Sequence, residues 1–170
     1  LVTEAAEFLL EAALVRAEDE PSILLRSAPG GRFMRIAVIN DDMPFLVDSI
    51  AATIAAVGLA IDLLVHPIVP VERKGGKLVA FPGGGGANES MIYLETARVD
   101  GRERRALEKT LETTLGDVRA AVADWPAMIE RIETDADSTG DPEGAELLRW
   151  LGGGMLTLLG HVTRTRAGGT

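Results

Sequence analysis

The sequence predicts an α+β fold in which helices pack on one face of a mainly antiparallel β-sheet. Short apolar segments bounded by Gly and Pro turns are typical of strands. Longer segments repeat apolar residues at spacings of three and four, which is typical of amphipathic helices. The predicted order is strand, helix, strand, strand, helix and a late strand, which gives two layers around one core.

The first predicted element is a helix over residues 3–18 that packs on the sheet and is ended by Pro21. Arg16 is expected near its end, where a cation complements the helix dipole. A short strand at 23–26 and the main strand at 33–39 follow. All four residues from Ile36 to Ile39 are apolar, which indicates a strand that is covered on both sides or central in its sheet.

An acidic turn with Asp41 and Asp42 joins the main strand to the next predicted helix. Pro44 is predicted in the first helical turn, because an N–H group there would have no intrahelical partner. Gly58 is predicted to end this helix in a left-handed conformation. The turn would then leave backbone N–H groups at the helix start free to meet a ligand or a partner.

The middle of the chain is predicted to form strands joined by turns. A long strand at 59–72 contains Pro67 and Pro70, so we expect it at a sheet edge or with a bulge. Residues 74–77 turn the chain and residues 78–81 return as a second arm. Residues 82–88 are predicted to be a plain loop and not a phosphate cradle, because a strand, at 91–99, follows them.

A long helix is predicted from 102 to about 132, with Pro126 causing either a kink near Asp124 or a fresh helix capped by Asp124. A linker at 134–140, a helix that begins at Asp141 and a last strand at 156–165 complete the prediction. Either the last strand or the one at 23–26 could complete the sheet. The predicted organisation is an N-terminal helix and strand (1–30), a core (31–133), and a linker, helix and strand (134–170).

The composition excludes several classes of function. The chain has 170 residues, no cysteine and a formal net charge of −9. The negative charge argues against nucleic-acid binding, which needs clustered Lys and Arg. No apolar run approaches the ~20 residues of a membrane span, and no signal peptide is visible. We expect a cytoplasmic protein without disulfides and, because the sequence does not begin with Met, a piece of a longer chain.

The candidate sites in the sequence are weak. Asp41, Asp42 and Asp48 could bind a divalent cation, but we favour a role for the adjacent pair in the turn and the helix start. His66 could contact a ligand, but we favour a hydrogen-bonded structural histidine. The two histidines lie too far apart in the sequence for a metal site. We identify no catalytic set of nucleophile, base and orienting group, and no nicotinamide-binding glycine fingerprint.

Several stretches resemble known proteins. Asp-x-Pro-x-Leu at 42–46, followed by Gly-Leu-Ala-Ile at 58–61, resembles the opening of an ACT domain. The string NDDMPFLVDS at 40–49 is similar to the N-terminal region of the large bacterial NAD-dependent glutamate dehydrogenases. Three further stretches fit that family: VHPI at 65–68, DVRAAVADW at 117–125, and LRWL at 148–151 with TLLG at 157–160.

The resemblance implies a ferredoxin-like, ACT-type βαββαβ sandwich. It also implies a non-catalytic, amino-acid-sensing regulatory domain, with NAD and the catalytic residues elsewhere in a parent enzyme that converts glutamate to 2-oxoglutarate. An amino-acid effector would place its carboxylate on the helix-start amides and its ammonium on an aspartate. The expected ligand contacts are Asn40, Asp41, Asp42, Met43, Pro44, Phe45 and Leu46, with His66 as a further one. The alternative is an assembly domain without a ligand, whose partners are further copies and the parent's other domains.

Overall fold

A computed structural model describes residues 2–28, 30–81, 86–162 and 164 of the chain. The chain divides into two compact units, Leu1–Val118 and Arg119–Thr170, and the boundary falls within the long helix α3 (Gly101–Ser138). None of the helices in the described ranges combines the length and the apolar character needed to cross a membrane.

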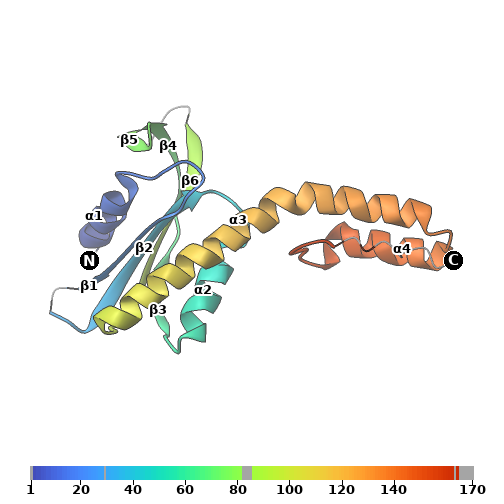
Figure 1. Cartoon of the computed structure of the whole chain (residues 1–170). Coiled ribbons are helices and arrows are strands. Elements are labelled where there is room, and N and C mark those ends of the chain that lie inside the picture. Colours follow the sequence, from blue (N-terminus) through green and yellow to red (C-terminus); the bar gives the residue numbers. More distant parts are fainter. Residues whose placement is uncertain (1, 29, 82–85, 163, 165–170) are drawn as a thin grey trace. The chain divides into compact units, whose positions relative to one another are not determined.

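The first unit contains a single antiparallel sheet (Figure 1). Its strand order is β1-β2-β6-β4-β5, and β3 pairs with β6 beside β4. The strands are β1 (Ser22–Ser27), β2 (Phe33–Asp41), β3 (Ile61–Val65), β4 (Ile68–Lys74), β5 (Lys77–Ala80) and β6 (Ala87–Ala97). These strands pair antiparallel, in agreement with the mainly antiparallel sheet that the sequence predicted.

Strand β1 completes the sheet, which settles the question that the sequence left open. All six of its residues pair with β2, from Ser22 opposite Ile39 to Ser27 opposite Met34. The prediction of a last strand at 156–165 is wrong for residues 156–162 and 164; residues 163 and 165 lie outside the described ones. The edge of β2 where a strand after the second helix of a βαββαβ fold would pair is already taken by β1.

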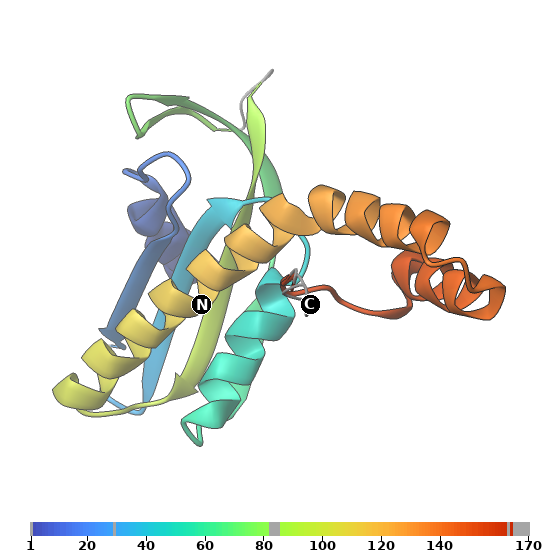
Figure 2. The same ribbon diagram turned by 45° about the vertical axis from the view of Figure 1, so that its right-hand side comes forward.

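Helices cover both faces of the sheet. Helices α2 (Leu46–Ala56) and α3 lie side by side over one face in Figures 1 and 2, where Ile50, Ile54 and Leu111 reach the core. Helix α1 (Val2–Ala13) covers the opposite face, where Phe8 packs edge-on against Tyr93 with ring centroids 6.2 Å apart. The prediction of helices on one face therefore holds for α2 and α3 but not for α1.

The central position of β2 confirms the prediction made from its continuous apolar pattern. Ile36 and Val38 belong to the cluster under α2 and α3, whereas Ala37 and Ile39 belong to the cluster under α1. All four side chains are fully buried. Period-two alternation thus places apolar groups on both faces, and both are covered.

Helix α1 is shorter than predicted. It ends at Ala13, and the backbone that follows pairs with the β4–β5 hairpin: Leu78 N–H donates to Leu14 O (3.0 Å) and Arg16 N–H donates to Gly76 O (2.9 Å). Gly76 allows this approach, since a Cβ there would lie 2.8 Å from Arg16 O. These bonds replace the helical bonds that residues 14–18 would otherwise make, so Arg16 lies outside the helix.

The predicted long strand at 59–72 is two strands, because the chain breaks at His66 and Pro67. Both strands pair with β6. Between them, Met91 N–H donates to Pro67 O (2.9 Å). Among the described residues β3 pairs with β6 alone, and the register shifts between Ile61 and Leu63. The edge position is therefore confirmed for β3, which holds no proline, whereas Pro70 lies in β4, which pairs with both β6 and β5. The register shifts in β3 and β4 do not fall at a proline. Residues 82–85 of the predicted loop lie outside the described residues, and β6 already begins at Ala87.

The first turn of α3 has a capping box. Asp100 Oδ1 accepts from the N–H groups of Arg102 (2.7 Å) and Glu103 (2.8 Å), and Glu103 Oε2 accepts from Asp100 N–H (3.0 Å). The helix continues through Pro126 to Ser138, so the alternative of a fresh helix at Asp124 is wrong. The linker predicted at 134–140 is helical up to Ser138, so the non-helical part begins at residue 139. Ion pairs from Arg131 to Asp135 and from Arg149 to Asp137 support this last stretch.

The second unit contains the end of α3 and helix α4 (Pro142–Trp150). Asp141 caps α4 as predicted, because Asp141 Oδ1 accepts from Glu143 N–H (3.2 Å). A five-residue π-helical stretch, Leu151–Met155, follows and loses helical backbone angles at Gly153 and Gly154. Helical backbone therefore ends within the glycine run at 152–154.

Candidate functional site

The acidic turn begins inside the sheet. Asn40 and Asp41 are the last residues of β2, and they pair with Ser90 and Glu89 of β6. The Asn40 side chain is buried, and its Nδ2 donates to Asp41 O (3.2 Å). The turn that carries the predicted ligand contacts is therefore fixed by the end of the β2–β6 ladder.

Both aspartates of the turn have side-chain partners in the fold. Asp41 Oδ1 accepts a hydrogen bond from Arg16 Nη2 at 2.6 Å. Asp42 Oδ1 accepts from Ser90 Oγ at 2.9 Å, and Asp42 N–H donates to Asn88 O at 3.2 Å. Neither carboxylate caps helix α2, whose N-cap has no side-chain hydrogen bond, so the expected capping role is wrong. The pair serves the turn by binding it to Arg16 and to β6.

Helix α2 begins at Leu46, two residues later than expected. Its N-cap is Phe45, which has a left-handed backbone (φ 70°), and Pro44 lies in the turn before the helix. An aromatic residue in this conformation is a genuine outlier that costs about 1–2 kcal/mol. The Phe45 side chain is 39% exposed, whereas Leu46 is 2% exposed and belongs to the core with Met43 packed against it.

His66 lies apart from the turn. It stands between β3 and β4 on one side of β6, whereas the turn ends β2 on the other side. Its Nε2 atom is buried and has no hydrogen-bond partner among the described residues, so the expected hydrogen bond is not found at that atom. The turn and His66 thus do not form one site within the sheet order. Among the described residues, no group of three or more His, Cys, Asp or Glu could hold a metal ion.

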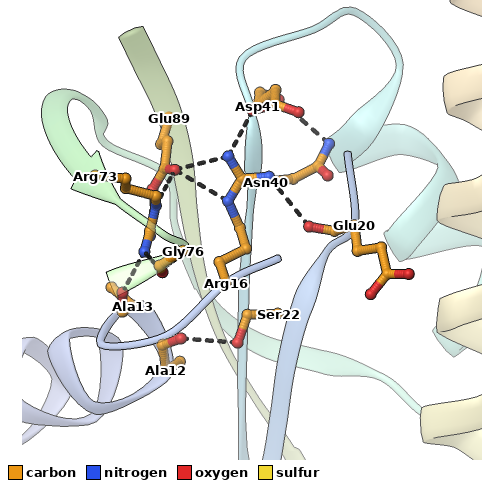
Figure 3. A network of polar contacts seen from close by, with 10 residues as sticks. All are labelled: Ala12, Ala13, Arg16, Glu20, Ser22, Asn40, Asp41, Arg73, Gly76 and Glu89. Atoms are coloured by element: carbon orange, nitrogen blue, oxygen red, sulfur yellow. Dashed lines mark hydrogen bonds and ion pairs between the residues drawn. The ribbon is translucent and has the colours of Figure 1, made fainter. Parts of the chain in front are cut away.

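The densest polar cluster of the first unit was not predicted (Figure 3). Glu89 of β6 is 1% exposed and lies between two arginines. Its Oε1 accepts from Arg16 Nε (3.0 Å), Arg16 Nη2 (2.8 Å) and Arg73 Nε (2.6 Å), and its Oε2 accepts from Arg73 Nη2 (2.8 Å). We call Arg16, Asp41, Arg73 and Glu89 the ion-pair network.

Backbone carbonyls engage the remaining sides of the network. Arg16 Nη1 donates to Glu20 O (3.1 Å), and Arg73 Nη1 donates to Ala13 O (2.9 Å) and Gly76 O (3.0 Å). As Figure 3 shows, the two guanidinium groups approach Glu89 from different segments, one after α1 and one in β4. The network therefore ties α1, β2, the β4–β5 hairpin and β6 together.

The electrostatics of Glu89 are dominated by its partners. Burial opposes ionisation of the carboxyl group, but hydrogen bonds from Arg73 and Arg16 outweigh it and hold the pKa of Glu89 below its usual range. The pKa of Arg16 is likewise raised: burial opposes its charge, but the hydrogen bonds to Asp41 and Glu89 prevail. The two positive charges of Arg16 and Arg73 are matched by the two negative charges of Asp41 and Glu89. The ion-pair network is therefore a charge-compensated structural clamp.

The network lines one side of an open cleft of about 690 Å³ between the segment after α1 and the β4–β5 hairpin. Because the charged groups in its wall are already paired with one another, a ligand there would have to compete with Glu89 or Asp41 for the guanidinium groups. Glu89 had one sequence signal: it shares the inward strand face with Met91 and Tyr93. Nothing in the sequence pairs it with Arg16 or Arg73.

Comparison with known proteins gives a consistent result. Residues 32–111 match the family described as the ACT1 domain of glutamate dehydrogenase. An NAD-specific glutamate dehydrogenase of Pseudomonas aeruginosa is 35% identical over 124 residues, which cover 69% of this chain and 7% of the relative. One of Halomonas elongata is 32% identical over 144 residues, covering 74% and 9%. The chain thus spans less than a tenth of the length of these relatives.

Proposed function

Because the chain belongs through residues 32–111 to the ACT1 domain family of glutamate dehydrogenase, we propose that it is a non-catalytic module of a longer, cytoplasmic NAD-dependent enzyme that deaminates glutamate to 2-oxoglutarate. The names of the two relatives support this proposal. NAD and the reacting groups would be held by other parts of the parent chain, since this sequence has no glycine fingerprint that opens a helix.

Within that enzyme, we propose that the module acts mainly in assembly, through the open edge of β3. This strand has β6 on one side and no strand on the other among the described residues. Its unpaired backbone groups can accept a further strand, as exposed sheet edges do. This open edge is the observation that carries the proposal.

The side chains along this edge suit a protein contact. Leu64 is 37% exposed and Val65 is 45% exposed, and Ile68 extends the apolar line at the start of β4. Pro67, which cannot donate to a ladder, lies just outside β3 and leaves the strand free to pair. The expected partners are a second copy of the module and the parent's other domains.

Sedimentation velocity over a wide range of concentrations tests the assembly proposal. We expect the wild-type chain to associate at high concentration and Leu64→Lys to stay a monomer. Leu147→Lys, on the second unit, is the matched control because Leu147 is also exposed, and it should associate as the wild type does. An 18.0 kDa species at every concentration of the wild type would contradict assembly between copies.

Amino-acid sensing is the second candidate function, and the start of α2 favours it. Exposed Asp42 and the strained, exposed Phe45 stand beside the first N–H groups of the helix, where a ligand carboxylate is favourable. The engagement of Asp41 by Arg16 leaves Asp42 as the better partner for an ammonium group.

Calorimetric titration with a panel of amino acids tests this second function. We expect a binding amino acid to lose affinity in Asp42→Ala but not in Asp48→Ala, which changes an exposed carboxylate one helical turn further along. The absence of a heat signal for every amino acid would contradict sensing and leave the assembly proposal intact.

A further inference from the structure

One end of the sheet brings several arginines together. The β2–β6 ladder ends with Phe33 opposite Ala97, so Arg32 and Arg98 are the next residues outward on two antiparallel strands. Gly31 leaves room for this arrangement, since Arg98 Nη1 lies 3.0 Å from where a Cβ of Gly31 would be. The register thus places Arg32 and Arg98 opposite each other just beyond the end of the ladder.

Helix α3 adds a third guanidinium group at this end. Arg98 and Arg104 line the same open cavity of about 530 Å³, together with Ser27 and Asp100. Arg102 and Arg105 follow in the same first turns of α3, and both are exposed. We call Arg32, Arg98 and Arg104 the arginine cluster.

The charges of the arginine cluster are not compensated within the described parts of the chain. No hydrogen bond or ion pair there reaches the three guanidinium groups, although the chain carries 26 acidic residues against 17 basic ones. Arg16, Arg26 and Arg149, by contrast, each pair with a carboxylate.

Asp100 is the carboxylate that lines this cavity, and its Oδ1 is already engaged. That oxygen accepts the N–H groups of Arg102 and Glu103, and Glu103 closes the capping box from its own side. Three guanidinium groups and the carboxylates of Asp100 and Glu103 leave a local excess of one positive charge. Like charges held this close repel one another, and a bound anion would relieve that repulsion.

We propose that the arginine cluster binds a small anion with two negative charges, a phosphate or a dicarboxylate, between Arg98 and Arg104 with Arg32 at the rim. The planar guanidinium fork matches the two oxygens of a carboxylate or phosphate. The Ser27 hydroxyl in the cavity wall supplies a neutral donor. This site lies at the opposite end of β2 from the acidic turn, so it goes beyond the proposed function and defines a separate effector site.

Calorimetric titration of the whole chain tests the proposal. Inorganic phosphate and succinate are the two probes, and chloride and acetate at the same ionic strength are the monovalent controls. We expect saturable binding of phosphate or succinate and at least a tenfold loss of affinity in Arg98→Gln and in Arg104→Gln. The stronger of the two probes then identifies the anion class.

Lys109→Gln is the matched control, because Lys109 is an exposed cation further along α3 and outside the cavity. It should bind within about twofold of the wild type, since the loss of one distant charge changes only the screened field. An equal loss in Lys109→Gln, or heats from chloride that match those from phosphate, would overturn the proposal. So would the absence of saturable binding.

Nuclear magnetic resonance of the wild-type chain locates the bound anion without the use of a variant. Phosphate or succinate should shift the side-chain Nε–H signals of Arg98 and Arg104 and leave that of Arg26, which is paired with Glu11, in place. Shifts confined to residues outside the arginine cluster would overturn the assignment of the site.

Discussion

Arg16 and Glu89, 73 residues apart in the sequence, form a buried ion pair in which Arg16 Nη2 lies 2.8 Å from Glu89 Oε1. Arg16 precedes the family match at residues 32–111, and Glu89 lies within it. The contact binds the segment after α1 to the centre of the sheet. The folding unit of this ACT-type module is therefore larger than the matched segment and includes α1 and β1.

Glu89→Gln should destabilise the first unit strongly. The substitution leaves Arg16 and Arg73 without their shared carboxylate, and breaking a buried ion pair in this way costs about 3–5 kcal/mol. Urea denaturation followed by far-ultraviolet circular dichroism measures the change. The control Glu11→Gln breaks the exposed pair with Arg26 and should have a far smaller effect. Equal losses would show that the ion-pair network is not a clamp.

The unfolding free energy of the wild type should decrease at acidic pH, because Glu89 becomes protonated there. Its folded-state pKa lies below the reference value of 4.5, so the unfolded state takes up a proton first as the pH decreases. The contribution of Glu89 is complete above about pH 4.5 and is lost as the pH falls through the lower, folded-state pKa. Urea midpoints measured from about pH 7 to about pH 3 should therefore converge between wild type and Glu89→Gln. Parallel curves would contradict this origin.

Removal of residues 1–20 should prevent stable folding of the first unit. The truncation uncovers Ala37, Ile39 and Tyr93 and leaves Glu89 buried without Arg16. Increased binding of a hydrophobic dye and the loss of a cooperative melt are the expected results. Removal of residues 119–170, which form the second unit, is the control and should leave the cooperative melt of residues 1–118 in place. A stable, monomeric chain without residues 1–20 would contradict the enlarged folding unit.

Alanine substitutions of the two residues at the start of α2, Phe45 and Leu46, should differ sharply in how much they lower the unfolding free energy. Leu46→Ala empties a core position and should cost about 2–5 kcal/mol of unfolding free energy. Phe45→Ala removes a half-exposed ring and should cost much less. Phe45→Gly should be more stable than Phe45→Ala by about 1 kcal/mol, because glycine adopts φ 70° without strain. Thermal melts rank the three variants, and the reverse order of Gly and Ala would contradict strain at Phe45.

The sequence predicted the elements of the first unit better than their connections. Continuous apolar residues from Ile36 to Ile39 predicted a doubly covered strand, because this pattern reflects burial on both faces. Pro67 and Pro70 predicted an edge position or a bulge, because proline cannot donate to a ladder. The structure confirms the doubly covered strand, whereas the part of the predicted long strand that lies at the edge is β3, which holds no proline.

The ion-pair network could not be predicted, because it depends on long-range contacts. Arg16 fits the end of an amphipathic helix equally well, and only its pairing with Glu89 and the hairpin decides against that. For the same reason the sequence could not decide whether β1 or residues 156–165 completes the sheet, because both segments have strand-like patterns. Strand β1 takes the edge of β2 along all six of its residues, and no local pattern in the sequence records which segment does so.

The family resemblance led to the ACT-type fold, and the ligand site that it implies stays a prediction. Asp42 and Pro44 carry the motif, yet Asp42 bonds to Ser90 and Pro44 lies before the helix. The arginine cluster was missed because Arg32 and Arg98 are distant in sequence and meet only at the end of the β2–β6 ladder.

The most direct test of the assembly proposal is a concentration series of nuclear magnetic resonance spectra of the labelled chain. The account predicts that the amide signals of Ile61–Val65 shift or broaden as the concentration rises, whereas those of the central strand β2 stay in place. In Leu64→Lys the β3 signals should not change with concentration. Wild-type β3 signals that stay constant up to the highest concentration, or changes confined to the second unit, would contradict the claim that β3 is the assembly edge.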